Sequence, residues 1–318
     1  MELRMVANES AWAMAAAFRL LASEPLPDEA LAAALAPGVQ ELAELLALAK
    51  VPSARAANHL IPQAACIGSN IELAHVLKRK LGIPPGSAAF RNGLVRAISA
   101  IEAAVLRTRP ELTKELADEA QRLEQVWLAY GGQRLLDVCA RLTDPLMIAP
   151  AATVLMGTGL GVSNALLPYN AVFFAPLPCD DGGRWHTVVL AYLLAQLQVD
   201  LPVYADRLLR SGPQRVASLA LVPVILAALA EVAPPQHSLV PSAVPPAGLG
   251  LVEALATGVS ETTIALWLTA SGREADAARY AAPLAAWWAA YLEGGNWPIA
   301  LAALDRLIAD AGVPAATP

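Results

Sequence analysis

The feature that most constrains this chain is a helical periodicity that turn residues interrupt at short intervals. As far as about residue 142, apolar residues recur at the spacing of one helix face, which predicts buried or amphipathic helices. Prolines and glycines end or begin helices, and they occur at Glu24-Pro-Leu-Pro, Ala36-Pro-Gly, Val51-Pro-Ser, Ile83-Pro-Pro-Gly and Tyr130-Gly-Gly. The sequence therefore predicts a series of short helices in this part of the chain.

The clearest β signal follows residue 149. Two short apolar runs, Ala152 to Met156 and Ala171 to Ala175, are separated by a stretch rich in glycine, asparagine and proline. This pattern is typical of two short strands joined by a turn. A helical pattern resumes at Trp185 and continues to about Val199. We therefore predict a mainly α fold, with a small β-hairpin or sheet at about 152–175 packed beside a central helix.

Changes of pattern divide the chain into three regions. Residues 1–148 form an N-terminal helical region, 149–233 hold the strands and the central helix, and 251–313 form a C-terminal helical region. All three can also belong to one continuous domain. Pro234 to Gly250 contains five prolines and few charges, which indicates a linker. Beyond it, Ser260 is expected to cap a helix.

The composition is apolar for a globular protein, because hydrophobic residues make up 56% and charged residues 16% of the 318 residues. Alanine, a strong helix former with little attraction to lipid, explains much of this excess. The strongest candidate for a membrane span, Val216 to Ala233, is interrupted by Pro223 and lacks a basic cluster or aromatic belt at its flanks. We predict a buried helix there and no membrane span.

The N-terminal residues, the cysteines and the charge together indicate a cytoplasmic protein. The N-terminal segment has a weak basic region and no small-residue cleavage site, so it makes a poor secretory signal, and an amphipathic helix is expected there instead. Cys66, Cys139 and Cys179 are odd in number and far apart, which disfavours disulfides and a cysteine zinc site. The net charge of −6 comes from interspersed charges without a basic stripe, so nucleic-acid binding is disfavoured.

A glycine-rich turn, Gly157-Thr-Gly-Leu-Gly, follows the first predicted strand. A dinucleotide-binding loop would need its third glycine at the position of Val162 and a helix directly afterwards. Here the chain leads into a second strand instead. We therefore interpret the turn as a hairpin connection and not as a nucleotide site.

Three segments carry a resemblance to a known family. They are Thr153-Val-Leu-Met, Tyr169-Asn-Ala-Val-Phe-Phe-Ala-Pro and Trp185-His-Thr-Val-Val-Leu-Ala-Tyr-Leu-Leu-Ala-Gln. Their order of strand, turn, strand, acidic loop and helix resembles the zincin metallopeptidases, in particular the gluzincin-type bacterial proteins described as predicted zinc-dependent proteases. The resemblance implies that an edge strand lines a substrate cleft and that the next helix stands where the family carries His-Glu-x-x-His.

Aligned by its apolar rhythm, this helix has Leu190, Ala191 and Leu194 where the family has its first His, its Glu and its second His. Ligands at i and i+4 share one helix face, and the glutamate polarises the zinc-bound water; leucine and alanine do neither. The third ligand is expected on the following helix, where Glu231 is the only carboxylate near the end. The resemblance therefore implies loss of zinc and catalysis, and we expect no metal, no cofactor and no catalytic residue.

Polar residues close to this helix offer a possible remnant site. His186 lies one turn before Leu190, and Cys179, Asp180 and Asp181 precede it. No two of these residues have a recognised metal-ligand spacing. The alternative interpretation is a histidine at a helix start beside a solvated acidic loop, whose aspartates favour the positive helix N-terminus.

The remaining histidines suggest a dispersed site. His59 and His75 both lie in helical sequence, with Glu72 nearby, and can face each other across a turn. Helix-surface or partly buried histidines with satisfied hydrogen bonds explain them at least as well. His237 lies in the predicted linker, where a site would be poorly held. Because catalytic groups often meet only in three dimensions, an enzyme built from His59, His75, Glu72 or His186 remains a hypothesis.

The leading hypothesis for function is a catalytically inactive, zincin-like pseudo-enzyme in the cytoplasm that binds a protein partner or self-associates. The first alternative is a helical small-molecule-binding protein with an apolar pocket between its helices, which the excess of alanine, leucine and valine favours. The second is the enzyme with a dispersed site.

Overall fold

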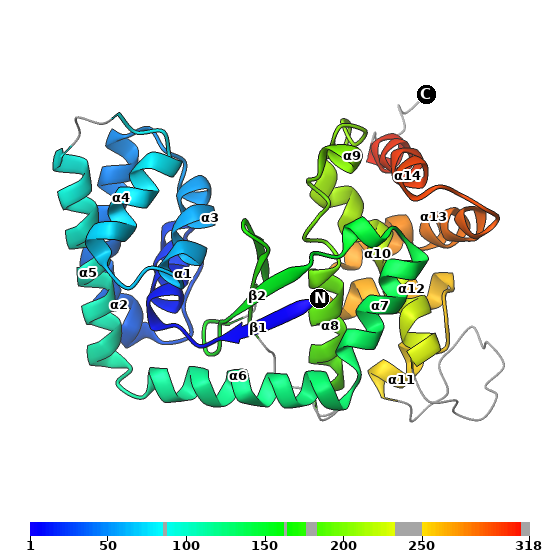
Figure 1. The fold of residues 1–318 in the computed structure, drawn as a ribbon, viewed down its shortest axis with the longest axis horizontal. Helices are drawn as coiled ribbons and strands as arrows, with labels where there is room; N and C mark the ends of the chain where they lie inside the picture. The colour runs from blue at the N-terminus through cyan, green and yellow to red at the C-terminus, as the bar shows by residue number, and fades with distance from the viewer. Residues whose placement is uncertain (85–87, 162–163, 176–182, 233–249, 313–318) are drawn as a thin grey trace. The chain divides into compact units, whose positions relative to one another are not determined.

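A computed structural model gives the structure of the chain and describes residues 1–84, 88–161, 164–175, 183–232 and 250–312. The chain is 68% helical and contains a small four-stranded mixed sheet (Figure 1). The predicted fold class, mainly α with a small sheet, is therefore confirmed.

The chain forms two compact units, each of which combines two segments. The sheet unit comprises Glu2–Glu124 and Ala151–Pro178, and the helical unit comprises Gln125–Pro150 and Cys179–Pro318, together with Met1. The strands after residue 149 thus join the N-terminal helices, because strand pairing is a long-range contact that local patterns do not reveal. The helix that follows the sheet in sequence belongs to the helical unit.

The helices before residue 130 follow the predicted breaks closely. They are α1 (Glu9–Leu21), α2 (Glu29–Leu48), α3 (Ser53–Ala64), α4 (Asn70–Lys80), α5 (Ala88–Thr108) and α6 (Leu112–Ala129), and the division between the units falls within α6. Asn8 and Asp28 cap α1 and α2, because each side chain accepts a hydrogen bond from a backbone N–H in the first turn. The breaks predicted near residues 24, 51, 83 and 130 all fall between helices.

One predicted break is wrong, because α2 continues through Pro37. A proline inside a helix removes a backbone hydrogen bond and clashes with the preceding turn, at a cost of about 3 kcal/mol. The helix persists because α2 packs closely on α5 at the next residue, Gly38. A Cβ atom at Gly38 would lie 2.8 Å from Cγ1 of Ile101, so glycine permits this close contact. Leu35 and Leu42 of the same face are fully buried, so the packing of this face offsets the proline.

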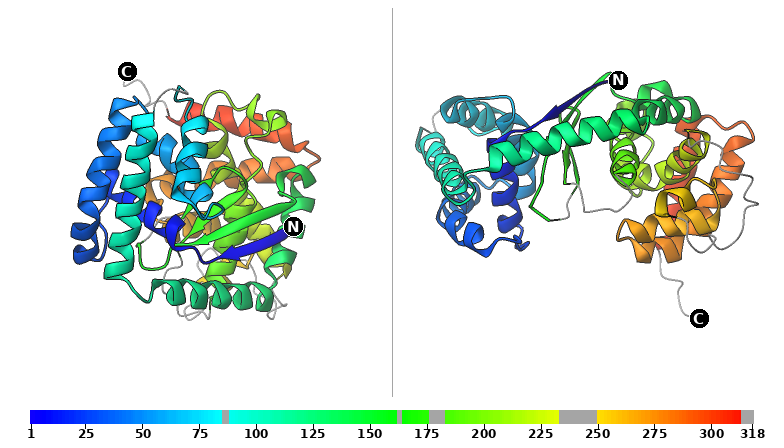
Figure 2. Two further views of the ribbon diagram at one scale, coloured as in Figure 1. Left: turned by 60° about the vertical axis from the view of Figure 1, so that its left-hand side comes forward. Right: turned by 90° about the horizontal axis from the view of Figure 1, so that it is seen from below.

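The sheet of the sheet unit has the order β1-β2-β4-β3. Its strands are β1 (Glu2–Val6), β2 (Ala151–Met156), β3 (Ala165–Leu167) and β4 (Ala171–Phe174). β1 and β2 are parallel neighbours that lie side by side in Figure 2, with Glu2 opposite Ala151 and Val6 opposite Leu155. β2 also pairs in parallel with β4, whereas β3 pairs with β4 in the antiparallel direction.

Two details of the strand prediction need correction. β2 and β4 are the two predicted strands, but they run parallel, because the connection between them contains β3 and reverses the chain twice. The amphipathic helix expected at the N-terminus begins only at Glu9, after β1. In β1, Glu2 and Arg4 are exposed and alternate with less exposed apolar residues, which is the two-residue period of a strand.

The helical unit contains a further set of helices. They are α7 (Gly132–Leu142), the short 3-10 helix η1 (Pro145–Met147), α8 (Arg184–Leu194), α9 (Pro202–Ala205), α10 (Pro213–Val232), α11 (Leu251–Leu255), α12 (Glu261–Ala270), α13 (Glu274–Leu292) and α14 (Trp297–Gly312). α8 ends before the predicted Val199. Ser260 caps α12 as predicted, by exchanging two hydrogen bonds with Thr263. The predicted linker, apart from Gly250, lies outside the described residues.

α10 forms the centre of the helical unit, where it packs against α7, α8, α12, α13 and α14. In the described part of the chain, α2 and α10 are the two helices that are long and apolar enough to cross a membrane. However, 67% of the apolar stretch of α10 is buried inside the protein, and the helix contains Pro223. These are the features of a core helix, so the structure does not require a membrane span.

Candidate functional site

The helix that carries the zincin resemblance, α8, is held inside the helical unit. It begins after Gly183, whose φ of 92° favours glycine, and it packs against α7, α10 and α11. Leu190, Ala191 and Leu194 all have 0% exposure. The three positions that the resemblance assigns to zinc chemistry are therefore part of the apolar core.

The polar remnants near α8 do not assemble into a metal site in the described residues. His186 is buried in the first turn of α8, and Cys179, Asp180 and Asp181 of the acidic loop lie outside the described residues. Glu231, at the end of α10, is exposed and forms an ion pair with Arg141 of α7. No group of three or more His, Cys, Asp or Glu side chains within the described residues is placed to hold a metal ion.

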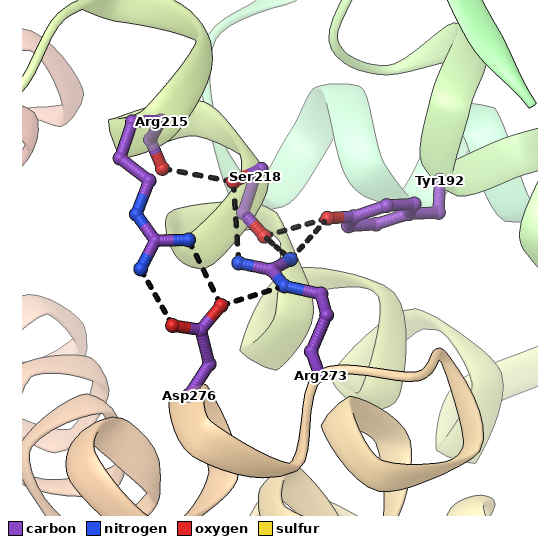
Figure 3. Close-up of polar contacts among 5 residues, drawn as sticks. All are labelled: Tyr192, Arg215, Ser218, Arg273 and Asp276. Carbon is purple, nitrogen blue, oxygen red and sulfur yellow. Dashed lines mark hydrogen bonds and ion pairs between the residues drawn. The ribbon is translucent and has the colours of Figure 1, made fainter. Parts of the chain in front are cut away.

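A connected polar network joins α8, α10 and α13 (Figure 3). Its centre is a two-point ion pair, in which Nη1 and Nη2 of Arg215 donate to Oδ2 and Oδ1 of Asp276 at 2.8 and 2.6 Å. Arg273, which directly precedes α13, donates from Nε to Oδ2 of the same carboxylate at 2.8 Å. Two guanidinium groups therefore share one carboxylate.

The network continues from Arg273 to the helix α8. Nη1 of Arg273 lies 3.2 Å from the backbone oxygen of Ser218 and 3.4 Å from the hydroxyl of Tyr192. The Tyr192 hydroxyl donates to the same Ser218 oxygen at 2.6 Å. Ser218 lies one turn into α10, so this single backbone oxygen connects all three helices. α10 is thereby hydrogen-bonded to α8 through Tyr192 and to the start of α13 through Arg273.

The charges of the network perturb its titratable groups. Hydrogen bonds from Arg215 lower the pKa of Asp276 to about 2, against the opposing effect of partial burial, and Arg273 adds to the lowering. Burial raises the pKa of the Tyr192 hydroxyl, although Arg273 opposes the shift. Arg215 also lies 5.5 Å from the ring centroid of Tyr280. The cluster thus keeps its charged form at neutral pH.

Aromatic rings cover one side of this network. The rings of Trp185 and Tyr192 lie 5.0 and 5.2 Å from that of Trp267, which is almost fully buried.

The network provides donors and one shared carboxylate, but no activated nucleophile and no base with a pKa near neutrality, so its chemistry is that of binding and packing. The sequence pattern does not predict this network. Its only local signal is the i, i+3 spacing of Arg273 and Asp276.

His59 and His75 of the proposed dispersed site lie in the sheet unit, and no hydrogen bond or ion pair among the described residues joins them. His59 lies on α3 and is paired with Tyr169, with 3.0 Å between Nδ1 and the hydroxyl oxygen. His75 and Glu72 are exposed on α4, and among the described residues neither forms a hydrogen bond or ion pair with His59. His186 belongs to the helical unit, and His237 lies outside the described residues. Tyr169 is thus the partner that the sequence analysis missed.

The glycine-rich turn has a packing role. A Cβ atom at Gly157 would lie 2.4 Å from Cε1 of Phe173 on β4, so only glycine lets β2 end against this ring. The indole nitrogen of Trp12 donates to the backbone oxygen of Thr158 at 2.9 Å, which ties the turn to α1. Gly159 has a φ of 79°. These contacts explain the glycines without a bound nucleotide.

Comparison with known proteins adds no relative: no protein-family model, no curated protein and no solved structure matches the chain. The resemblance to zincins stays a prediction. A function must therefore be argued from the residues themselves.

Proposed function

We propose that this chain is a non-catalytic binding or assembly protein whose core has a zincin-like arrangement without the zinc. The observation that carries the proposal is the complete burial of Leu190, Ala191 and Leu194 on α8. These side chains occupy the positions at which a zincin of this type would present two imidazoles and a carboxylate.

Burial of these residues gives a physical reason for the change of role. A zinc site needs ligands at i and i+4 with an open coordination position for water. A buried leucine instead contributes about 1.5 to 3 kcal/mol to folding by removal of apolar surface from water. In this proposal, α8 keeps its place in the core of the unit because it now stabilises that core.

The polar network supports a non-catalytic role. Most of its donors and acceptors are used between α8, α10 and α13, so it organises the helices more than it offers a reactive group. We infer a protein partner or self-association, and no nucleic acid. A cytoplasmic location is proposed because Cys66 is an exposed free thiol and Cys139 a buried one, and such thiols persist in a reducing compartment.

The test is metal analysis of the purified full-length chain after growth with supplementary zinc, combined with a peptidase assay on unstructured casein. We expect far less than one zinc per chain and no casein hydrolysis above a blank. Stoichiometric zinc that is lost when His186 is replaced in the variant His186→Asn would overturn the proposal, and so would casein hydrolysis that a chelator abolishes.

A further inference from the structure

The sheet unit carries an unusual turn that presents a tyrosine. Tyr169 and Asn170, between β3 and β4, have φ values of 68° and 52°. A tyrosine rarely adopts this left-handed backbone conformation, and such residues cluster at functional sites. The backbone oxygen of Asn170 accepts a hydrogen bond of 2.9 Å from Thr153 of β2, which holds the turn against the sheet. Tyr169 itself is 46% exposed.

A histidine of α3 and a lysine of α4 meet at this tyrosine. Its hydroxyl is hydrogen-bonded to Nδ1 of His59 on α3, and Nζ of Lys80, the last residue of α4, lies 5.1 Å from its ring centroid. Arg55 lies one turn before His59 on α3. Burial lowers the pKa of His59, and the positive charges of Arg55 and Lys80 lower it further.

In the part of the chain that the structure describes, no ion pair joins Arg55 or Lys80 to an acidic residue. Among the described residues, the ion pairs of the sheet unit involve Arg19, Arg96, Arg109 and Arg122, and none includes Arg55 or Lys80. The segment from Ser53 to Lys80 contains four basic residues and one acidic residue, in a chain with a net charge of −6. The favourable effect of cations on the end of α4 applies to Lys78, Arg79 and Lys80 alike, and Lys80 in addition lies over the Tyr169 ring.

We propose that Arg55, His59, Lys80 and Tyr169 form a binding site for a tetrahedral oxyanion, specifically a phosphate group. An ammonium, a guanidinium and an imidazole provide the charge-assisted donors that such a group requires, and the Tyr169 hydroxyl orients the imidazole. When the Tyr169 hydroxyl donates to Nδ1 of His59, the proton of the neutral ring lies on Nε2, which is then the donor available to a ligand. Free phosphate and a phosphate ester share this chemistry. The site lies in the sheet unit and does not depend on the zincin resemblance.

The experiment is a calorimetric titration of the full-length chain with inorganic phosphate at low salt and pH 6.5. We expect saturable binding of one phosphate per chain. Lys80→Gln and Arg55→Gln should each weaken binding about 10-fold, which corresponds to the loss of one charge-assisted contact. Tyr169→Phe keeps the ring and should weaken it by about 3-fold to 10-fold. Lys114→Gln is the matched control, because Lys114 is an exposed lysine on α6 of the same unit, and it should bind as the wild type does.

Further ligands identify the source of the phosphate. Tighter binding of glycerol 3-phosphate than of inorganic phosphate supports an ester as the natural ligand, whereas equal binding supports the free ion. The proposal is overturned if phosphate binding does not saturate, if acetate binds as tightly as phosphate, or if Lys114→Gln weakens binding as much as Lys80→Gln does.

Sulfate provides a readout that folding alone would not move, because sulfate does not titrate between pH 5 and 8. A bound dianion should raise the pKa of His59, which faces Arg55 on its own helix, Lys80 from α4 and Tyr169 from the turn. Sulfate affinity should therefore increase as the pH falls through the range where His59 gains its proton. His59→Gln should abolish this increase. An unchanged pH profile in His59→Gln would exclude His59 from the site.

Discussion

Arg215 at the start of α10 and Asp276 in the first turn of α13 are joined by two parallel hydrogen bonds, of 2.8 and 2.6 Å (Figure 3). Two-point contacts between a guanidinium and a carboxylate add directional specificity to the attraction of the charges. Since Arg273 binds the same carboxylate and also reaches Tyr192 of α8, this pair determines how three helices meet. Its loss should affect the whole helical unit.

We expect Asp276→Asn to lower the free energy of unfolding by about 1 to 3 kcal/mol at pH 7, because the two arginines lose their shared acceptor. The effect should depend on pH. The pKa of Asp276 is lowered to about 2 in the folded protein, so its contribution is present above the unfolded pKa of about 4 and is lost as the pH falls towards 2. Urea unfolding between pH 2 and 7 measures it.

The control for this experiment is Asp206→Asn, since Asp206 is an exposed carboxylate of the same unit. It should unfold as the wild type does at every pH. If Asp276→Asn retained the wild-type loss of stability between pH 4 and 2, the carboxylate of Asp276 would not be the group responsible.

A second prediction concerns Asp305, which is 2% exposed on α14. Its carboxylate accepts the backbone N–H groups of Arg210 at 3.0 Å and Ser211 at 2.7 Å, and so anchors the segment before α10. Asp305→Ala should cost about 2 kcal/mol of unfolding free energy, because two backbone donors lose the buried carboxylate that accepts them. Asp310→Ala, at an exposed position of the same helix, should cost less than about 0.5 kcal/mol. Equal losses in the two variants would contradict the anchoring role.

The helices could be predicted from sequence because their signals are local. Proline and glycine breaks place the ends of most helices, and Ser260 was identified as a cap from its position alone. The error at Pro37 has a different origin, since the contact between Gly38 and Ile101 joins α2 to α5. A local pattern contains no information about that partner. β1 was missed for the same reason, because Glu2 pairs with Ala151.

Neither site could be derived from spacing. Arg215 and Asp276 are far apart in sequence, and so are His59 and Tyr169. Each pair forms only because helix packing or the turn between β3 and β4 brings its members together. The resemblance includes α8, and Tyr192 of this helix belongs to the network. The arginines that complete the network stand outside the segments that carry the resemblance.

The glycine-rich turn gives a third prediction. Gly157→Ala should lower the stability of the sheet unit by about 1 to 3 kcal/mol, because the added methyl group would overlap the ring of Phe173. At Gly68, by contrast, an added Cβ atom meets nothing within 4 Å, so Gly68→Ala should be neutral or slightly stabilising. Thermal unfolding of both variants decides this point. A neutral Gly157→Ala would mean that the turn is not held by close packing.

The last prediction tests the alignment of α8 with the zinc-binding helix. The variant Leu190→His, Ala191→Glu, Leu194→His places three polar groups at positions with 0% exposure, and should lower the free energy of unfolding by more than about 3 kcal/mol. Added zinc should not restore it, since Glu231 is exposed and paired with Arg141 and supplies no third ligand.

The control Leu128→His adds one histidine at a position that is 73% exposed, and should be near neutral. If the triple variant fails to fold, Leu190→Ala should still show the cavity cost of about 2 to 5 kcal/mol. An unchanged melting temperature of the triple variant, with and without zinc, would mean that these positions face solvent and that the alignment is wrong. Recovery of stability with one zinc per chain would instead mean that a ligand set persists near α8, which the proposal of a lost site does not allow.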